Sequence, residues 1–280
     1  MQELMTFGQM LGVHARLLGN QVGARDLERA LTFAQWDERA CRLANALIGL
    51  GLAKGDRVAL IAETGPEFAA LFCGCVYAGA WPVPLPLPTS FGGKDAYVDQ
   101  LAVQLASSDP KVLFYPGEIA ELAHPAAERQ GCEGLAWQDF AARPAPDHAL
   151  PEASPDDICY LQYSSGSTRF PHGVAVTHAS LLNNLAGHGE GMKLLASDRC
   201  VSWLPWYHDM GLVGCFLSPI ANQVSADYLK TEDFARRPLA WLDLISRNPL
   251  VFPAIHGLVR RAMIRRFPYG LYYRASATEI

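Results

Sequence analysis

The feature that most constrains the fold is an alternation of helix-like and strand-like segments that starts about thirty residues into the chain. Thr32 can cap a helix whose capping box Gln35 closes. A turn at 54–56 then leads into the apolar run 57–62, which fits a buried strand, and Pro66 is well placed to open a second helix. Because helix and strand signals alternate, we expect an α/β fold with parallel-rich sheets and flanking helices.

The segment 81–88 interrupts this pattern because proline alternates with apolar residues. It must be extended and can pair only at a sheet edge, if it pairs at all. Further along, apolar runs predict strands at 111–115, 157–163 and 174–177, and a helix that begins at Ala179.

Residues 141–157 are rich in proline, alanine and acidic side chains and predict an exposed linker. We expect the linker to separate an N-terminal α/β subdomain (1–140) from a second α/β subdomain (158–247), with a divergent basic tail at 248–280. Half of the 280 residues are apolar, which is enough to build a large core.

Charge, hydropathy and cysteine spacing exclude several classes of protein. A formal charge of −5 gives no reason to expect a nucleic-acid partner, and prolines break the longest uncharged stretch before it could span a membrane. No two of the seven cysteines form a Cys-x-x-Cys pair, so we expect them to be reduced thiols in the core. No export signal is apparent at the N-terminus, and we expect a cytoplasmic protein.

The stretch 163–173, YSSGSTRFPHG, carries the clearest chemical signal. Four hydroxyl side chains surround Gly166 directly after an apolar strand. Hydroxyls and backbone N–H groups can converge there on an anion, and glycine lets the backbone approach closely, as a triphosphate requires. The Walker pattern is absent, and the alternative is a polar surface turn.

A second segment, VSWLPWYHDMG at 201–211, predicts an aromatic strand that ends at His208 and Asp209. A histidine beside an aspartate is more often a structural pair than a catalytic one. Its position some forty residues after the hydroxyl-rich loop favours a role in the same site.

Together these segments resemble the adenylate-forming superfamily of acyl- and aryl-CoA synthetases, luciferases and nonribosomal peptide adenylation domains, and within it the fatty acyl-AMP ligases. Four stretches have counterparts there in the same order, and the resemblance covers roughly residues 5–247. They are PVPLPLPTSFGGKD (82–95), LQYSSGST (161–168), LPWYHDMGL (204–212) and FARRPLAWLDLISR (234–247).

The resemblance implies ATP-dependent activation of a fatty acid to an acyl-adenylate, with release of pyrophosphate. His208 would be catalytic, at the junction of the acyl carboxylate and the α-phosphate, and Thr168 would help to place Mg²⁺. An acyl carrier protein or coenzyme A would accept the acyl group. The residues implied to bind ATP are Ser164, Ser165, Gly166, Ser167, Thr168, Arg169, His172 and Gly173.

Two positions of the loop depart from the family pattern: Arg169 replaces a glycine and His172 replaces a lysine. His172 is mostly neutral near pH 7, so we expect the guanidinium of Arg169 to supply the positive charge. The alternative is a loop that has lost its affinity for ATP.

The family's adenine-binding segment, ribose-binding aspartate, acidic Mg²⁺ ligand and lid lysine would all lie beyond residue 250, and none is found. We therefore expect a truncated, impaired ligase whose adenylation is at least about a thousandfold slower than that of an intact relative. The alternative is a non-catalytic remnant that binds ATP or an acyl chain. The end of the tail, RRFPYGLYYRASATEI (265–280), is similar to the strand near the end of ParE-type toxins, which indicates truncation or fusion; the alternative is an ordinary solvated, Arg-rich terminus.

Two further functions are disfavoured. A serine hydrolase using Ser164–Ser167 with His208 would need a G-x-S-x-G elbow, which is absent. A metal site of His172, His178 and His208 matches no common ligand spacing.

Overall fold

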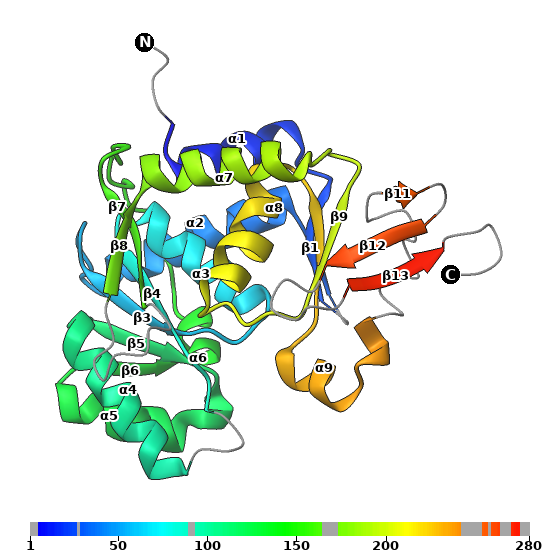
Figure 1. Cartoon of the computed structure of the whole chain (residues 1–280). Coiled ribbons are helices and arrows are strands. Elements are labelled where there is room, and N and C mark those ends of the chain that lie inside the picture. The colour runs from blue at the N-terminus through cyan, green and yellow to red at the C-terminus, as the bar shows by residue number, and fades with distance from the viewer. Residues whose placement is uncertain are drawn as a thin grey trace.

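The computed structural model describes residues 5–26, 29–88, 93–163, 173–241, 254–256, 259–263 and 270–274 (Figure 1). The strands are β1 (Val22–Arg25), β2 (Ala30–Thr32), β3 (Arg57–Ile61), β4 (Trp81–Leu85), β5 (Val112–Tyr115), β6 (Glu133–Ala136), β7 (Ile158–Tyr163), β8 (Gly173–Thr177), β9 (Arg199–Ser202), β10 (Ser225–Tyr228), β11 (Ala254–His256), β12 (Val259–Met263) and β13 (Gly270–Arg274).

The helices are α1 (Phe7–Leu17), α2 (Phe33–Gly49), α3 (Pro66–Tyr77), α4 (Lys94–Ser108), α5 (Ala120–Gln130), α6 (Trp137–Ala141), α7 (His178–Met192), α8 (Ser218–Ala221) and α9 (Thr231–Arg236), with a 3-10 turn η1 (Gly117–Ile119) and a π-helix η2 (Met210–Leu217). This arrangement confirms the expected α/β class.

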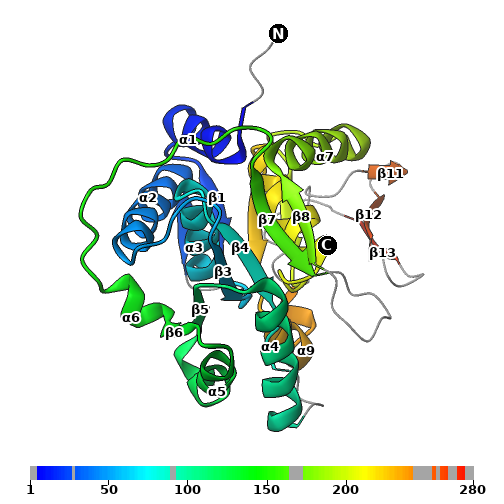
Figure 2. The same ribbon diagram turned by 90° about the vertical axis from the view of Figure 1, so that its left-hand side faces the viewer.

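A fully parallel sheet in the order β4-β3-β5-β6 forms one layer of the fold. The proline-containing strand β4 lies at its edge, as the sequence predicts, because Pro82 and Pro84 cannot donate to a second neighbour. The antiparallel pair β7 and β8 lies beside β4 (Figure 2). The strand that leads into the hydroxyl-rich loop therefore packs next to this sheet.

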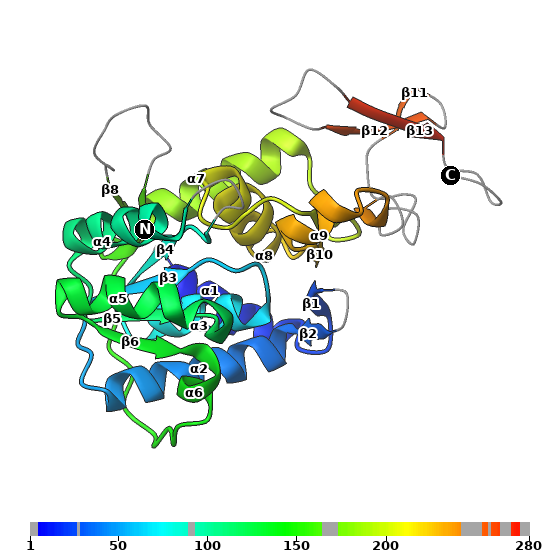
Figure 3. The ribbon, with the colours of Figure 1, turned by 90° about the horizontal axis from the view of Figure 1, so that it is seen from below.

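The second main sheet, in the order β2-β1-β10-β9, joins segments that lie far apart in the sequence. β1 pairs in parallel with β10, and the Oγ of Ser225 donates to the backbone oxygen of Val22 at 2.5 Å. β10 in turn pairs in parallel with β9, the strand that precedes the His208 segment. Strands β11, β12 and β13 form a separate antiparallel sheet, set apart from the other two in Figure 3.

The connection at 142–157 is irregular and mostly exposed, and it contacts α2 and the turn that follows α2. Lys54 forms an ion pair with Asp157 at 2.6 Å, and the Oδ1 of Asn45 accepts from the backbone N–H of His148 at 3.0 Å. Both the second sheet and the larger core draw residues from before and after this connection. A division into subdomains at 141–157 stays a prediction.

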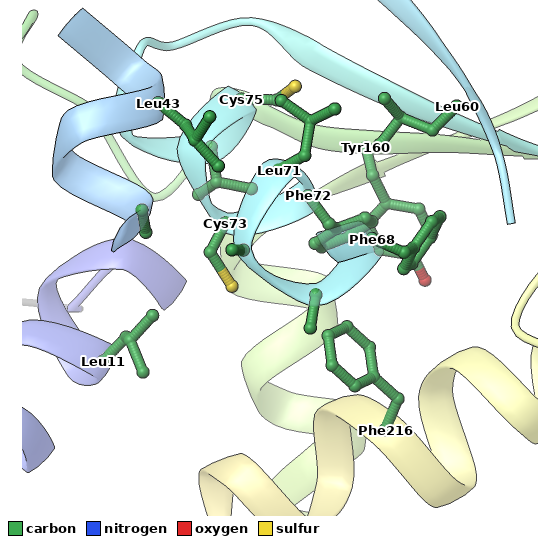
Figure 4. Close-up of a cluster of buried hydrophobic side chains, with 14 of the residues drawn as sticks. Leu11, Leu43, Leu60, Phe68, Leu71, Phe72, Cys73, Cys75, Tyr160 and Phe216 are labelled. Atoms are coloured by element: carbon green, nitrogen blue, oxygen red, sulfur yellow. The ribbon is translucent and has the colours of Figure 1, made fainter. Parts of the chain in front are cut away.

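An aromatic core lies around α3, where ten of the twelve residues are buried (Figure 4). Phe68 and Phe72 contact Phe216 from η2, with ring centroids 6.2 and 5.9 Å apart, and Tyr160 from β7 packs on Phe72 at 5.9 Å. These contacts connect the strand before the hydroxyl-rich loop with the helix after His208. None of the helices in the described ranges is long and apolar enough to cross a membrane.

Candidate functional site

The hydroxyl-rich loop connects the end of β7 to the start of β8. Tyr163 and Gly173 face each other in the antiparallel register, so the two ends of the loop lie side by side. A Cβ atom on Gly173 would lie 2.9 Å from the side chain of Leu161, which accounts for glycine there. The hydroxyl of Tyr163 donates to the backbone oxygen of Gln104 at 3.0 Å and holds the end of β7 against α4. The base of the loop is therefore fixed.

Most of the implied ATP-binding residues lie outside the described part of the chain, so their contacts and their distance from His208 stay predictions. They are Ser164, Ser165, Gly166, Ser167, Thr168, Arg169 and His172.

Tyr160 and Gln162 lie on β7, the strand that leads into the hydroxyl-rich loop. They lie two residues apart on the strand, so both side chains project from the same face, and both are buried. Burial, Cys159 and the charge of Asp209, in that order, raise the pKa of the Tyr160 hydroxyl. This face therefore lies within electrostatic range of the turn that carries His208.

The segment expected to be an aromatic strand over 201–207 is a strand only as far as Ser202, so that prediction is wrong. The Oγ of Ser202 accepts from the backbone N–H of Leu204 at 3.1 Å and turns the chain out of the sheet. Pro205 has no N–H to continue the ladder. A turn follows, closed by the backbone N–H of His208, which donates to the oxygen of Pro205 at 3.3 Å.

His208 is half-buried at the start of η2, with its ring 4.4 Å from that of Tyr207. The backbone oxygen of His208 accepts from Leu212 at 2.8 Å. Asp209 is exposed, and its Oδ1 accepts from the N–H of Met210, so it caps the π-helix. A capping carboxylate at a helix N-terminus also balances the partial positive charge of the helix dipole.

Two aromatic contacts hold the turn from either side. The ring of Trp206 is buried and stacks on Phe216 at 4.4 Å. Trp203 lies parallel to Phe234 of α9, with centroids 4.0 Å apart. His208 is thereby presented on a turn whose neighbouring side chains are locked by packing.

Gly211 allows the close approach of η2 to the turn. A Cβ atom at this position would overlap the carbonyl oxygen of Pro205 and would lie 3.1 Å from that of Leu204. Gly214, in the same helix, has open space around its Cα.

We predict that Gly211→Ala lowers the free energy of unfolding by about 1–3 kcal/mol, because the 204–205 backbone must move to admit the methyl group. The matched control is Gly214→Ala, which should leave stability unchanged or raise it by up to about 1 kcal/mol. Urea denaturation of both variants checks this. Equal effects would show that the Gly211 contact is not a constraint on the turn.

Nε2 of Gln162 and Nε1 of Trp206 are buried donors that find no acceptor in the described structure. No three His, Cys, Asp or Glu side chains gather to hold a metal among the described residues.

Comparisons with known proteins agree with this geometry. The sequence model for the AMP-binding enzyme family matches residues 15–269, and so includes part of the segment expected to diverge after Arg247. The long-chain-fatty-acid–AMP ligase FadD26 of Mycobacterium marinum is 34% identical over 246 residues, which is 84% of this chain and 41% of that protein.

Two solved structures of fatty acyl-adenylate ligases also match. One, from work on the E. coli and L. pneumophila enzymes, is 45% identical with a TM-score of 0.80 and covers 87% of this chain and 45% of that one. The L. pneumophila enzyme in complex with acyl adenylate and pyrophosphate is 27% identical with a TM-score of 0.77, covering 87% of this chain and 43% of that one.

The chain thus spans about two-fifths of the length of curated relatives that it matches. The resemblance stated from the sequence motifs is confirmed by a family match over most of the chain. The chain belongs to the AMP-binding enzyme family, and fatty acyl-AMP ligases are among its relatives.

Proposed function

We propose that this chain supplies the phosphate loop and the catalytic histidine of an enzyme that activates a fatty acid with ATP, forming an acyl-adenylate and releasing pyrophosphate. The observation that carries the proposal is the 45% identity of this chain to a solved fatty acyl-adenylate ligase. This chain also has both the loop closed by Tyr163 and Gly173 and the turn of His208.

When bound, ATP supplies the α-phosphorus that the fatty carboxylate attacks in line, with pyrophosphate as the leaving group. The backbone N–H groups and hydroxyls of residues 164–168 bind the phosphate oxygens, and Arg169 forks two of them in place of the family's lysine. His208 donates a hydrogen bond where the carboxylate meets the phosphate. Positioning and neutralisation of negative charge are therefore the main contributions of the chain.

Mg²⁺ would be held by the hydroxyl of Thr168 together with phosphate oxygens. The acceptor is the thiol of an acyl carrier protein or of coenzyme A, because thiols attack the mixed anhydride of an acyl-adenylate. We place the protein in the cytoplasm, since the described cysteines are all free, as in a reducing compartment.

A second function, binding of ATP or an acyl chain without turnover, is favoured by the two departures in the loop. Arg169 and His172 stand where the family pattern has glycine and lysine. Binding and catalysis are separable by experiment.

The test measures acyl-AMP by mass spectrometry and pyrophosphate release with ATP, Mg²⁺ and a panel of medium- and long-chain fatty acids. The chain is assayed alone and mixed with the separately expressed remainder of a fatty acyl-AMP ligase. We expect fatty-acid-dependent acyl-AMP in the mixture, and at least about a thousandfold less from the chain alone.

His208→Ala should lower the rate in the mixture by about a hundredfold or more, because a preorganised donor is lost. The matched control His148→Ala replaces an exposed histidine of the connection and should leave the rate unchanged. ATP binding without acyl-AMP in the mixture would favour the binding-only function. Absence of both would refute the ligase proposal.

A further inference from the structure

Two cysteines meet beside the His208 turn, one on each side of it. Cys200 lies on β9 and Cys215 on η2, and the Sγ of Cys200 is 3.8 Å from the backbone oxygen of Cys215. Both residues are partly exposed. Cys73, Cys75 and Cys159 are buried instead.

The contact shifts the pKa values of the two thiols in opposite directions. The hydrogen bond from Cys200, helped by the hydroxyl of Ser202, lowers the pKa of the Cys215 thiol although burial opposes this. The same hydrogen bond, together with burial, raises the pKa of Cys200. Cys215 is therefore the more acidic of the two thiols, and we expect it to be the first to react.

We propose that Cys200 and Cys215 are a redox modification site, which a hydroperoxide converts into a disulfide. The Cys215 thiolate attacks one peroxide oxygen, the O–O bond breaks, and hydroxide leaves, giving a sulfenic acid. The sulfur of Cys200 then attacks Sγ of Cys215, its proton leaves with the oxygen as water, and the S–S bond forms. Two thiols lose two electrons, and hydrogen peroxide becomes two waters.

The disulfide closes a ring of residues 200–215 that contains His208. Before oxidation, β9 and η2 are joined across this turn by packing and hydrogen bonds only. The bridge would tie the strand that enters the turn to the helix that leaves it. This inference concerns the chain itself and does not depend on the proposed ligase activity.

The test treats the folded 280-residue chain with a small excess of hydrogen peroxide, blocks remaining thiols with N-ethylmaleimide and maps the peptides. Trypsin leaves both cysteines on one peptide, 200–230, so the bridge shows as the loss of two hydrogens and of both alkyl groups. Chymotrypsin then yields two peptides joined by the disulfide. A dithiol reductant should restore both thiols.

Variants separate the two roles. With Cys200→Ser, we expect a sulfenic acid at Cys215 that dimedone traps; with Cys215→Ser, Cys200 should stay alkylatable. Cys132→Ser, which removes another partly exposed thiol, should leave the disulfide yield unchanged. In the wild-type chain, Cys215 should react with iodoacetamide about tenfold faster than Cys132, whose pKa is raised by burial.

Three results would overturn the proposal. Both thiols of peptide 200–230 could remain open to alkylation after peroxide treatment, or Cys200 and Cys215 could form disulfides with Cys41 or Cys132 in the same yield as with each other. The third result is formation of the Cys200–Cys215 disulfide to the same extent in denaturing urea. The last would mean that the fold does not direct the bridge.

Discussion

Asp227→Asn lowers the free energy of unfolding by about 3–5 kcal/mol, because it breaks a buried ion pair and leaves a guanidinium uncompensated. Asp227 is 3% exposed in β10, one of the two inner strands of its sheet. Its Oδ2 accepts from Nε of Arg199 at 2.6 Å and its Oδ1 from Nη2 at 2.9 Å, while Arg25 lies 3.9 Å away on the opposite neighbour. Asparagine fills the same space but removes the charge. Urea denaturation measures the loss.

The matched control is Asp99→Asn, which breaks an ion pair of similar length with Arg129 at 2.6 Å. The side chains of that pair are 51% and 70% exposed, so water already solvates them and the expected loss is below about 1 kcal/mol. If both variants lost the same stability, burial of Asp227 would not be the source of its effect.

Acidification from pH 7 to pH 4 should lower the stability of the chain by about 3 kcal/mol through His178 alone. His178 is 3% exposed at the start of α7, and its Nδ1 accepts from the backbone N–H of Phe7. Burial lowers the pKa of this imidazole from 6.5 to about 4; the charge of Asp157 opposes the shift and that of Lys54 adds to it.

The sign follows from which state binds the proton. Between pH 6.5 and pH 4 the unfolded chain protonates this histidine and the native chain does not, so each step down in pH favours unfolding. Below about pH 4 both states carry the proton and this loss stops. His14, whose pKa is also lowered by burial, contributes in the same direction.

Urea denaturation at a series of pH values checks this expectation. His178→Gln should flatten the slope of stability against pH in this window, whereas His148→Gln, at an exposed position, should keep it. A wild-type slope preserved in His178→Gln would mean that other groups carry the dependence.

Local sequence signals predicted the elements that depend on near neighbours. Thr32 and Gln35 exchange both hydrogen bonds of the expected capping box, at 3.2 and 3.1 Å. Pro66 opens α3, and the proline-rich strand lies at a sheet edge. Each of these outcomes follows from the chemistry of a few adjacent residues.

The parts that sequence analysis missed depend on contacts between distant segments. The π-helix after Asp209 cannot be inferred from periodicity, because it rests on the fit of Gly211 against the backbone at 204–205. Helix α1 and strand β1 carry weak signals of their own and are held by later segments, as when Phe7 donates to His178. The hydroxyl-rich loop and His208 were proposed from their residue types alone, and their roles stay predictions.

The parallel pairing of β1 with β10 sets the order in which the protein can be assembled during translation. The antiparallel partner of β1, strand β2, is synthesised directly after it. The partner of its other edge, Ser225–Tyr228, is synthesised some two hundred residues later. At about 5–20 residues per second, that edge stays open for roughly 10–40 s while the sheet β4-β3-β5-β6 already has all its strands. On the ribosome, the first strand of the chain is therefore among the last to be covered, and a nascent-chain chaperone would find it exposed.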